Sequence, residues 1–301
     1  MVLVIGEILF DIFPEYRRLG GAPFNFAYHL KNLGMDTRFI SRVGRDEPGQ
    51  KIIDFIDKHG FNGDDIQVDP DHETGTVHVK LNPDGTPEFN IRPNAAYDYI
   101  QCDESVKKLL EHPPALIYFG TLMQRTGNGF QTIQQMLSQK KTATRTLYDI
   151  NLRPGCYSEK IIAASLERTD ILKLNHEELS FLSWMLREKT GTRNLIDRLF
   201  REFAIESIVL TAGENGSEWF TDKKHRRIKP TGPIDIVDTV GAGDAYAAIV
   251  ALGYLQKWPV EKILSLANCF AAHICSIKGA LPDGKDVYNR ILKKRGDLDE
   301  S

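Results

Sequence analysis

A carboxylate beside a glycine turn is the strongest chemical feature of the sequence. Residues 235–245 read Asp-Ile-Val-Asp-Thr-Val-Gly-Ala-Gly-Asp-Ala, and the Ala-rich apolar run that follows predicts a buried helix. Gly241 and Gly243 would then lie at a helix start, where unpaired N–H groups and the helix dipole can hold an anion. Asp244 would repel a phosphate that was only bound. It suits a base that takes the proton from a hydroxyl attacking that phosphate.

A structural interpretation of the same turn is equally open when the turn is taken alone. Gly-Ala-Gly can serve tight helix packing, and Asp244 can be a first-turn acid favoured by the helix dipole. A short glycine motif does not separate the two interpretations.

A second polar group precedes a helical pattern near the N-terminus. Gly20 and Gly21 allow unusual backbone angles, and the Ala-Pro pair after them suits the first turn of a helix. Asn25 lies in that turn, and Asp11 lies on a short extended segment before it. A carboxylate and an amide can each satisfy paired hydroxyls, as on a polyol, although a simple helix start explains the glycines too.

Two further polar groups follow apolar strands, at the edge where α/β sheets bind ligands. Asp149 and Arg153 could line a ligand site or form a local turn with a surface salt bridge. Asn175 and Glu178 have the spacing of a capping box. A glutamate would also suit a cation that prefers hard oxygen ligands, and both roles are compatible.

The remaining motifs are weaker. Thr211, Gly213 and Gly216 form a turn pattern that is usually only a turn, and Asn268 lies within an apolar helical run where an amide is usually structural. The basic run 223–227 predicts a solvated hairpin tip, because no row of aromatic residues accompanies it.

The elements that position these groups alternate between strand and helix. Apolar strand patterns recur between helical patterns along most of the chain, which predicts a mainly parallel α/β sheet. A hairpin pattern over 75–91 interrupts this rhythm, so it should lie outside the main sheet, together with the extended segment 8–13. We find no internal repeat or linker and expect one domain over residues 1–301.

Composition narrows the class of protein. The 301 residues include 42% hydrophobic residues and carry a net charge of −3, which predicts a globular protein without a basic nucleic-acid surface. No apolar run is long enough for a bilayer, and the first residues lead into a strand rather than a signal peptide. The four cysteines lack CxxC spacing, so we expect reduced thiols in a cytoplasmic protein and no membrane partner.

Residues 238–244 (Asp-Thr-Val-Gly-Ala-Gly-Asp) closely resemble the C-terminal signature of the ribokinase-like (PfkB) carbohydrate kinases. Residues 20–25 resemble the N-terminal signature of the same family, and Asp-x-Asn-x-Arg-Pro at 149–154 is typical of its fructokinase and 2-keto-3-deoxygluconate kinase branches. The resemblance implies a three-layer α/β/α sandwich with a small β-sheet lid from about 8–20 and 74–92. In the family this lid is often a dimer contact, so a homodimer through it is an expectation.

The resemblance also implies a role for each site residue. Asp244 corresponds to the catalytic base, and Gly241, Ala242 and Gly243 correspond to the anion hole. The residues implied for sugar or substrate are Asp11, Gly20, Gly21, Asn25 and Arg153. Those implied for the nucleotide are Asn175, Thr211, Gly213, Gly216 and Asn268. Glu178 is implied to orient water around Mg²⁺, and Asp238 is a candidate ligand for K⁺.

The sequence therefore predicts an ATP- and Mg²⁺-dependent sugar kinase, most like a fructokinase. The alternatives within the family are 2-keto-3-deoxygluconate kinase, ribokinase and nucleoside kinase. A keto-acid substrate would need a cation for its carboxylate, and Arg92 leaves that open. A non-catalytic sugar or nucleotide sensor on this fold is the alternative of another class, but Asp244 and both glycines are present. A dinucleotide-dependent oxidoreductase would need G-x-G-x-x-G after the first strand, and Gly6-Glu7-Ile8 is not that motif.

Overall fold

Short apolar strands separated by helices assemble into one large sheet. The computed structural model describes residues 1–81, 87–230 and 235–297. The order of the nine strands is β13-β12-β11-β10-β9-β8-β1-β4-β5, and all neighbours are parallel except β11–β12 and β12–β13. The strands are β1 (Val2–Ile5), β4 (Thr37–Gly44), β5 (Ile66–Asp69), β8 (Leu116–Gly120), β9 (Arg145–Asp149), β10 (Ile171–Asn175), β11 (Ser207–Thr211), β12 (Ser217–Phe220) and β13 (His225–Ile228). The expected mainly parallel sheet is confirmed.

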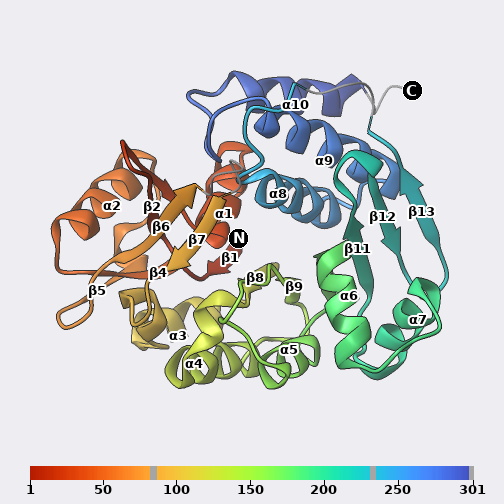
Figure 1. The fold of residues 1–301 in the computed structure, drawn as a ribbon, viewed down its shortest axis with the longest axis horizontal. Helices are drawn as coiled ribbons and strands as arrows, with labels where there is room; N and C mark the ends of the chain where they lie inside the picture. The colour runs from red at the N-terminus through yellow and green to blue at the C-terminus, as the bar shows by residue number, and fades with distance from the viewer. Residues whose placement is uncertain (82–86, 231–234, 298–301) are drawn as a thin grey trace.

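Helices cover both faces of this sheet (Figure 1). Alternate residues of β1 belong to two separate cores, Val2 and Val4 to one and Leu3 and Ile5 to the other, as expected for a strand buried on both sides. The first core includes α1 (Ala22–Asn32), α2 (Glu47–Lys58), α8 (Ala242–Leu255), α9 (Val260–Cys275) and α10 (Asp286–Asp297). The second includes α3 (Glu104–Glu111), α4 (Gly127–Ser138), α5 (Glu159–Leu166), α6 (His176–Met185) and α7 (Thr192–Glu202). This is the expected three-layer α/β/α sandwich.

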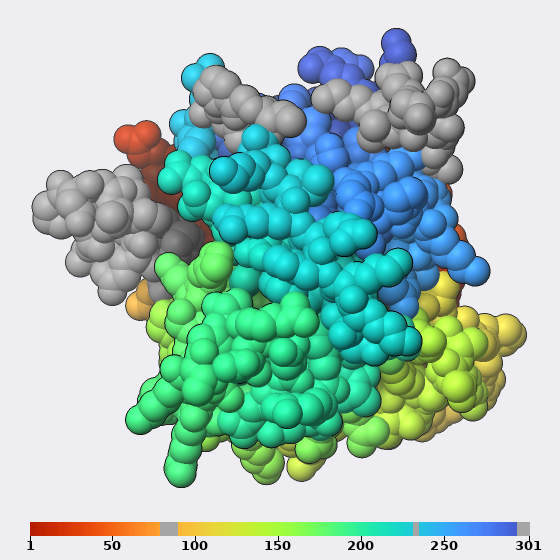
Figure 2. Space-filling view, turned by 90° about the vertical axis from the view of Figure 1, so that its right-hand side faces the viewer, coloured from red at the N-terminus to blue at the C-terminus, as the bar shows by residue number. Residues whose placement is uncertain are grey.

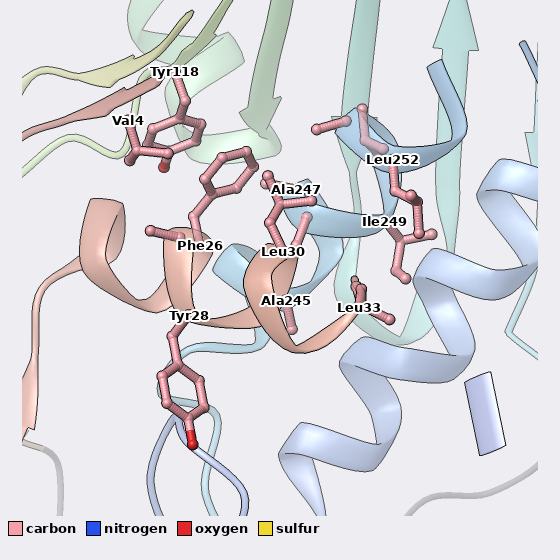
Figure 3. Packing of buried hydrophobic residues seen from close by; sticks show 14 of the residues in the cluster. Val4, Phe26, Tyr28, Leu30, Leu33, Tyr118, Ala245, Ala247, Ile249 and Leu252 are labelled. Atoms are coloured by element: carbon pink, nitrogen blue, oxygen red, sulfur yellow. The ribbon is translucent and has the colours of Figure 1, made fainter. Parts of the chain in front are cut away.

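Helices α1 and α8 pack against each other although they lie near opposite ends of the chain. Phe26 of α1 stacks on Tyr118 of β8 with ring centres 3.9 Å apart, beside Val4, and Ala247 of α8 faces the same helix (Figure 3). The glycine-rich starts of the two helices are therefore brought together.

A second sheet of four strands stands apart from the first. Its order is β3-β2-β6-β7, from β2 (Leu9–Ile12), β3 (Arg17–Gly20), β6 (Gly75–Leu81) and β7 (Pro87–Ile91). The expected small separate sheet is confirmed, whereas residues 82–86 of the expected lid segment 74–92 lie outside the described residues.

One strand of the large sheet and one of the helices that cover it were not predicted from the sequence. Strand β5 is an edge strand in which Val68 is exposed, so it carries no clear run of buried residues. Helix α5 buries Ile161, Ile162, Ser165 and Leu166 over its 8 residues, and the sequence analysis did not select it. Figure 2 shows the opposite end of the sheet, where residues from α7 (green) to β13 (cyan) meet the α9 segment (blue). In the described ranges, every helix is too short or too polar to span a lipid bilayer.

Candidate active site

A cavity of about 330 Å³ opens at the carboxyl ends of the parallel strands. Its wall includes residues that follow β1, β9, β10 and β11, the start of α8, and side chains of the small sheet. This edge is where parallel α/β sheets commonly bind ligands. The residues expected at the site that line the cavity are Asp11, Gly21, Asn25, Arg153, Asn175, Glu178, Thr211, Gly241, Gly243 and Asp244.

The start of α8 has the geometry of an anion-binding turn. Gly241 is the N-cap residue, with a left-handed φ of 78°. A Cβ atom built on Gly241 would lie 2.2 Å from Cβ of Ala280, so only glycine fits there. Within the part of the chain that the structure describes, the amide N–H groups of Gly243 and Asp244 have no acceptor. Such free groups at a helix N-terminus favour an anion.

Asp244 lies in the first turn of α8 and is held by a residue of α1. The side-chain amide of Asn25 donates a hydrogen bond of 2.8 Å to Oδ2 of Asp244, and both side chains are buried. Burial raises the pKa of Asp244 to about 6, while the Asn25 hydrogen bond and the cations Lys173 and Arg153 lower it. A carboxylate with a pKa slightly below neutral is mostly ionised at pH 7 and can accept a proton.

The N-terminal glycines bring α1 close to the backbone after β1. Gly21 has a φ of 111°, and a Cβ on it would lie 2.6 Å from the carbonyl oxygen of Glu7. Gly20 is not part of the cavity wall, but a Cβ there would lie 2.9 Å from Oδ2 of Asp11. Burial raises the pKa of Asp11 to about 6, and Arg153 and Arg18 lower it.

Glu7 is a buried acid of the cavity wall that the sequence analysis did not select. Burial raises its pKa to about 7, Arg153 lowers it, and Asp244 raises it further. Its position directly after the first strand was the available signal. Arg153 is exposed at the same wall, and among the described residues it forms no ion pair. It is therefore placed to meet an anionic group of a ligand.

A buried ion pair supports the floor of the cavity. Nζ of Lys173 in β10 lies 2.9 Å from both carboxylate oxygens of Asp149 in β9. The sequence left open whether Asp149 lines a ligand site or forms a surface salt bridge with Arg153. The carboxylate of Asp149 instead pairs with the buried Lys173 and lines the cavity. A lysine within the apolar strand Ile171–Asn175 was the signal for this pair.

Asn175 and Glu178 form the expected capping box of α6. The Glu178 N–H donates to Oδ1 of Asn175 at 2.8 Å, and the Asn175 N–H donates to Oε2 of Glu178 at 2.8 Å. Oε1 of Glu178 accepts a further 3.1 Å bond from the N–H of Leu152. Each carboxylate oxygen keeps a free lone pair, and the side chain lines the cavity. The donor set thus fits a water-mediated contact to Mg²⁺, which keeps several waters in protein sites.

Three residues expected near the nucleotide lie outside the cavity wall. Gly213 and Gly216 flank a short turn after β11, with φ of 53° and 89°. Asn268 of α9 accepts a 3.1 Å hydrogen bond from Oγ of Ser217 in β12. That contact ties a helix to the sheet. Of the residues expected near the nucleotide, Asn175 and Thr211 line the cavity.

Asp238 is also outside the cavity wall, and its carboxylate is already bonded. Oδ2 accepts hydrogen bonds from the Arg18 guanidinium at 3.2 Å and from the Gly279 N–H at 2.9 Å, and Oδ1 accepts one from the Val240 N–H at 3.1 Å. A guanidinium at this distance would repel a second cation, so the residues present do not fit K⁺ bound to Asp238.

A buried acid beside free N–H groups at the start of α8, in a cavity at the carboxyl edge of a parallel sheet, is the arrangement expected of a phosphotransferase on a ribokinase-like α/β fold. The chain belongs to the pfkB family of carbohydrate kinases, whose pattern it matches over residues 16–284.

Relatives of this family differ in their substrates. A probable chloroplastic fructokinase-6 of Arabidopsis thaliana is 27% identical over 97% of this chain and 82% of the relative. A 5-dehydro-2-deoxygluconokinase of Clostridium botulinum is 25% identical over 92% of this chain and 85% of the relative. The crystal structure of a fructokinase with bound ATP from Xylella fastidiosa has a TM-score of 0.86 at 19% identity, covering 98% of each chain. This likeness confirms the fold.

Proposed function

We propose that this carbohydrate kinase transfers the γ-phosphoryl group of ATP to a hydroxyl of a small neutral sugar, with fructose as the first candidate. The observation that carries the proposal is the position of Asp244. Its carboxylate is oriented by Asn25 and lies next to the free N–H groups of the α8 start, within one cavity. The same place can therefore hold a hydroxyl, its base and a phosphoryl group.

Each residue of this chain has a part in the transfer. Asp244 takes the proton of the attacking hydroxyl. The turn 241–243 holds the phosphoryl group, and the free N–H groups of Gly243 and Asp244 stabilise the charge on its oxygens, whereas the Ala242 N–H already donates to the Thr239 carbonyl oxygen at 3.3 Å. Asp11, Gly21 and Asn25 hold the sugar, and Arg153 contacts phosphate or substrate. Asn175, Thr211, Gly213, Gly216 and Asn268 are proposed to contact the nucleotide. Mg²⁺ would neutralise the phosphates of ATP, with Glu178 in contact with its water shell.

The charges of the cavity support a neutral acceptor. Its wall carries the acids Glu7, Asp11, Glu178 and Asp244, whereas Lys173 is neutralised by Asp149. Arg153 alone is then left, among the described residues of the wall, as a cation without a carboxylate partner. A sugar acid would place one more negative charge there, which costs energy.

Arg92 does not supply the cation that a keto acid would need. It forms an ion pair with Glu73 and lies outside the cavity wall. The candidates 2-keto-3-deoxygluconate and 5-dehydro-2-deoxygluconate are therefore second to fructose.

The small sheet is proposed to act as a lid. Its side chains Leu9, Val77 and Ile91 line the cavity and give it an apolar wall, which would exclude water from the phosphoryl group. We also retain a homodimer through this sheet as a proposal, which light scattering of the purified protein would test.

A coupled ADP-release assay tests the function. Fructose, ribose, adenosine, 2-keto-3-deoxygluconate and 5-dehydro-2-deoxygluconate are compared at equal concentration, with Asp244→Asn as the control for contaminating kinases. The highest kcat/KM is expected with fructose. A clear preference for a sugar acid would refute the neutral acceptor, and binding of sugar and ATP without ADP release would favour the sensor.

A further inference from the structure

The start of the anion-binding turn is tied to the small sheet by one side chain. Arg18 lies on β3, and its guanidinium Nη1 is 3.2 Å from Oδ2 of Asp238, which precedes the turn. The side chains of Arg18 and Asp238 are 23% and 22% exposed, so the pair is largely shielded from water. Shielding strengthens such a contact relative to an exposed salt bridge.

The carboxylate of Asp238 also accepts hydrogen bonds from the two segments that border the turn. Its Oδ1 accepts the N–H of Val240, one residue before Gly241, and its Oδ2 accepts the N–H of Gly279. Gly279 precedes Ala280, against which Gly241 packs so closely that no Cβ fits between them. The carboxylate of Asp238 therefore joins the two segments that shape the anion-binding turn.

Arg18 is itself held in place on the small sheet. Its guanidinium carbon lies 4.9 Å from the ring centre of Tyr16 and 5.8 Å from that of Phe13, and these two rings stack at 4.5 Å. Gly279 has a φ of 86°, and a Cβ on it would lie 2.9 Å from Nη1 of Arg18, so the guanidinium would have to shift to admit a larger residue. Arg18 is also paired in register with Asp11, the acid of the cavity wall.

We propose that Arg18 is a positioning residue, which supplies the positive charge at Asp238 and so couples the small sheet to the anion-binding turn. The guanidinium takes the place that a monovalent cation would otherwise hold at this carboxylate. Turnover of this chain is therefore independent of K⁺. Arg18 is also the residue opposite Asp11 on the neighbouring strand β2. The same side chain therefore aligns sugar held by the small sheet with the phosphoryl group held at the turn.

The test compares Arg18→Gln with Arg17→Gln, its neighbour on β3. Arg17 pairs with Glu47, away from the cavity wall, so Arg17→Gln removes an equal charge from the same strand. Kinase rates are measured in KCl and in choline chloride at equal ionic strength, with whichever sugar gives turnover. The result is then independent of the sugar's identity.

The expected pattern is specific. Wild-type and Arg17→Gln rates agree within about twofold in both salts, whereas kcat of Arg18→Gln falls about tenfold or more in choline, the size expected for losing a hydrogen bond to a charged group. K⁺ or Arg18→Lys restores part of the loss, because each returns a positive charge. Addition of K⁺ leaves the melting temperature of the wild type unchanged, since K⁺ does not bind the folded state.

Two results would overturn the proposal. One is a wild-type rate or melting temperature that depends on K⁺, and the other is an Arg18→Gln enzyme equal to Arg17→Gln in both salts. Asp238→Asn removes the negative charge from the other partner of the Arg18–Asp238 contact. If Arg18→Gln does not fold, a tenfold loss in Asp238→Asn supports the proposal and an unchanged rate refutes it. Where both fold, the double variant should lose no more than either single one.

Discussion

The side-chain amide of Asn25 and the carboxylate of Asp244 meet at 2.8 Å although 219 positions separate them in the sequence. The first residue belongs to α1 and the second to α8, and these helices pack against each other. The contact joins the segment proposed to bind sugar to the segment that carries the proposed base. It also sets the protonation of the base, because the amide N–H lowers the pKa of Asp244 against the effect of burial.

Replacing the base should remove catalysis without removing the fold. Asp244→Asn keeps the shape of the side chain but cannot accept a proton, so we expect kcat to fall by roughly 100-fold to 10,000-fold. Calorimetry should show sugar affinity within a few-fold of the wild type. Near-normal turnover in this variant would exclude Asp244 as the base.

The Asn25 contact should be visible in the pH dependence. Asn25→Ala removes a hydrogen bond that lowers the pKa of Asp244, so that pKa rises from its value of about 6. The base is then protonated up to a higher pH, and the acidic limb of the kcat/KM profile should move to higher pH. Asn32→Ala is the matched control, because the Asn32 amide of the same helix donates to the carbonyl oxygen of Tyr28 and lies outside the cavity wall. An equal shift in both variants would contradict the assignment.

Alanine variants of two glycines with similar backbone angles distinguish the effect of backbone strain from the effect of a steric clash. Gly241 and Gly284 have φ of 78° and 90°, but only at Gly241 would a Cβ meet another atom, Cβ of Ala280 at 2.2 Å. Each change to alanine costs about 1 kcal/mol in backbone strain. Gly241→Ala should also displace the anion-binding amides and reduce kcat by about 100-fold. Kinase assays and melting curves of both variants test this, and equal activities would show that Gly241 serves the fold alone.

Glu7 should make stability depend on pH. Burial raises its pKa from 4.5 in the unfolded chain to about 7 in the folded protein, so the folded state binds more protons between these values. The free energy of unfolding therefore falls as pH rises from 4.5 to 7, by about 3 kcal/mol. Glu7→Gln does not titrate and should melt higher than the wild type at pH 8, with little difference at pH 4.5. A difference independent of pH would contradict this prediction.

Much of the fold follows from local patterns. Apolar runs such as Val2–Ile5 predict strands buried on both faces, and the capping-box spacing of Asn175 and Glu178 predicts where α6 begins. The glycine turns at 20–21 and 241–243 likewise predict the starts of α1 and α8. These features succeed because each depends on neighbouring residues only.

The parts that failed depend on residues far apart in the sequence. The burial of Lys173 becomes reasonable only when β9 places Asp149 beside it. Arg18 appears as an ordinary polar strand residue until Asp238 lies next to it. Glu7 is unusual only because the cavity wall buries it. No local pattern records these contacts, because each joins segments that only the folded chain brings together.

The packing of α1 on α8 has a consequence for protein synthesis. Phe26 and Leu30 of α1 are fully buried in the finished protein, partly by residues 242–255. A ribosome adding about 5–20 residues per second produces that covering helix some 10–40 seconds after α1 emerges. During this interval the nascent chain carries an uncovered apolar helix, so chaperones or slow, paused translation would have the most influence on its yield.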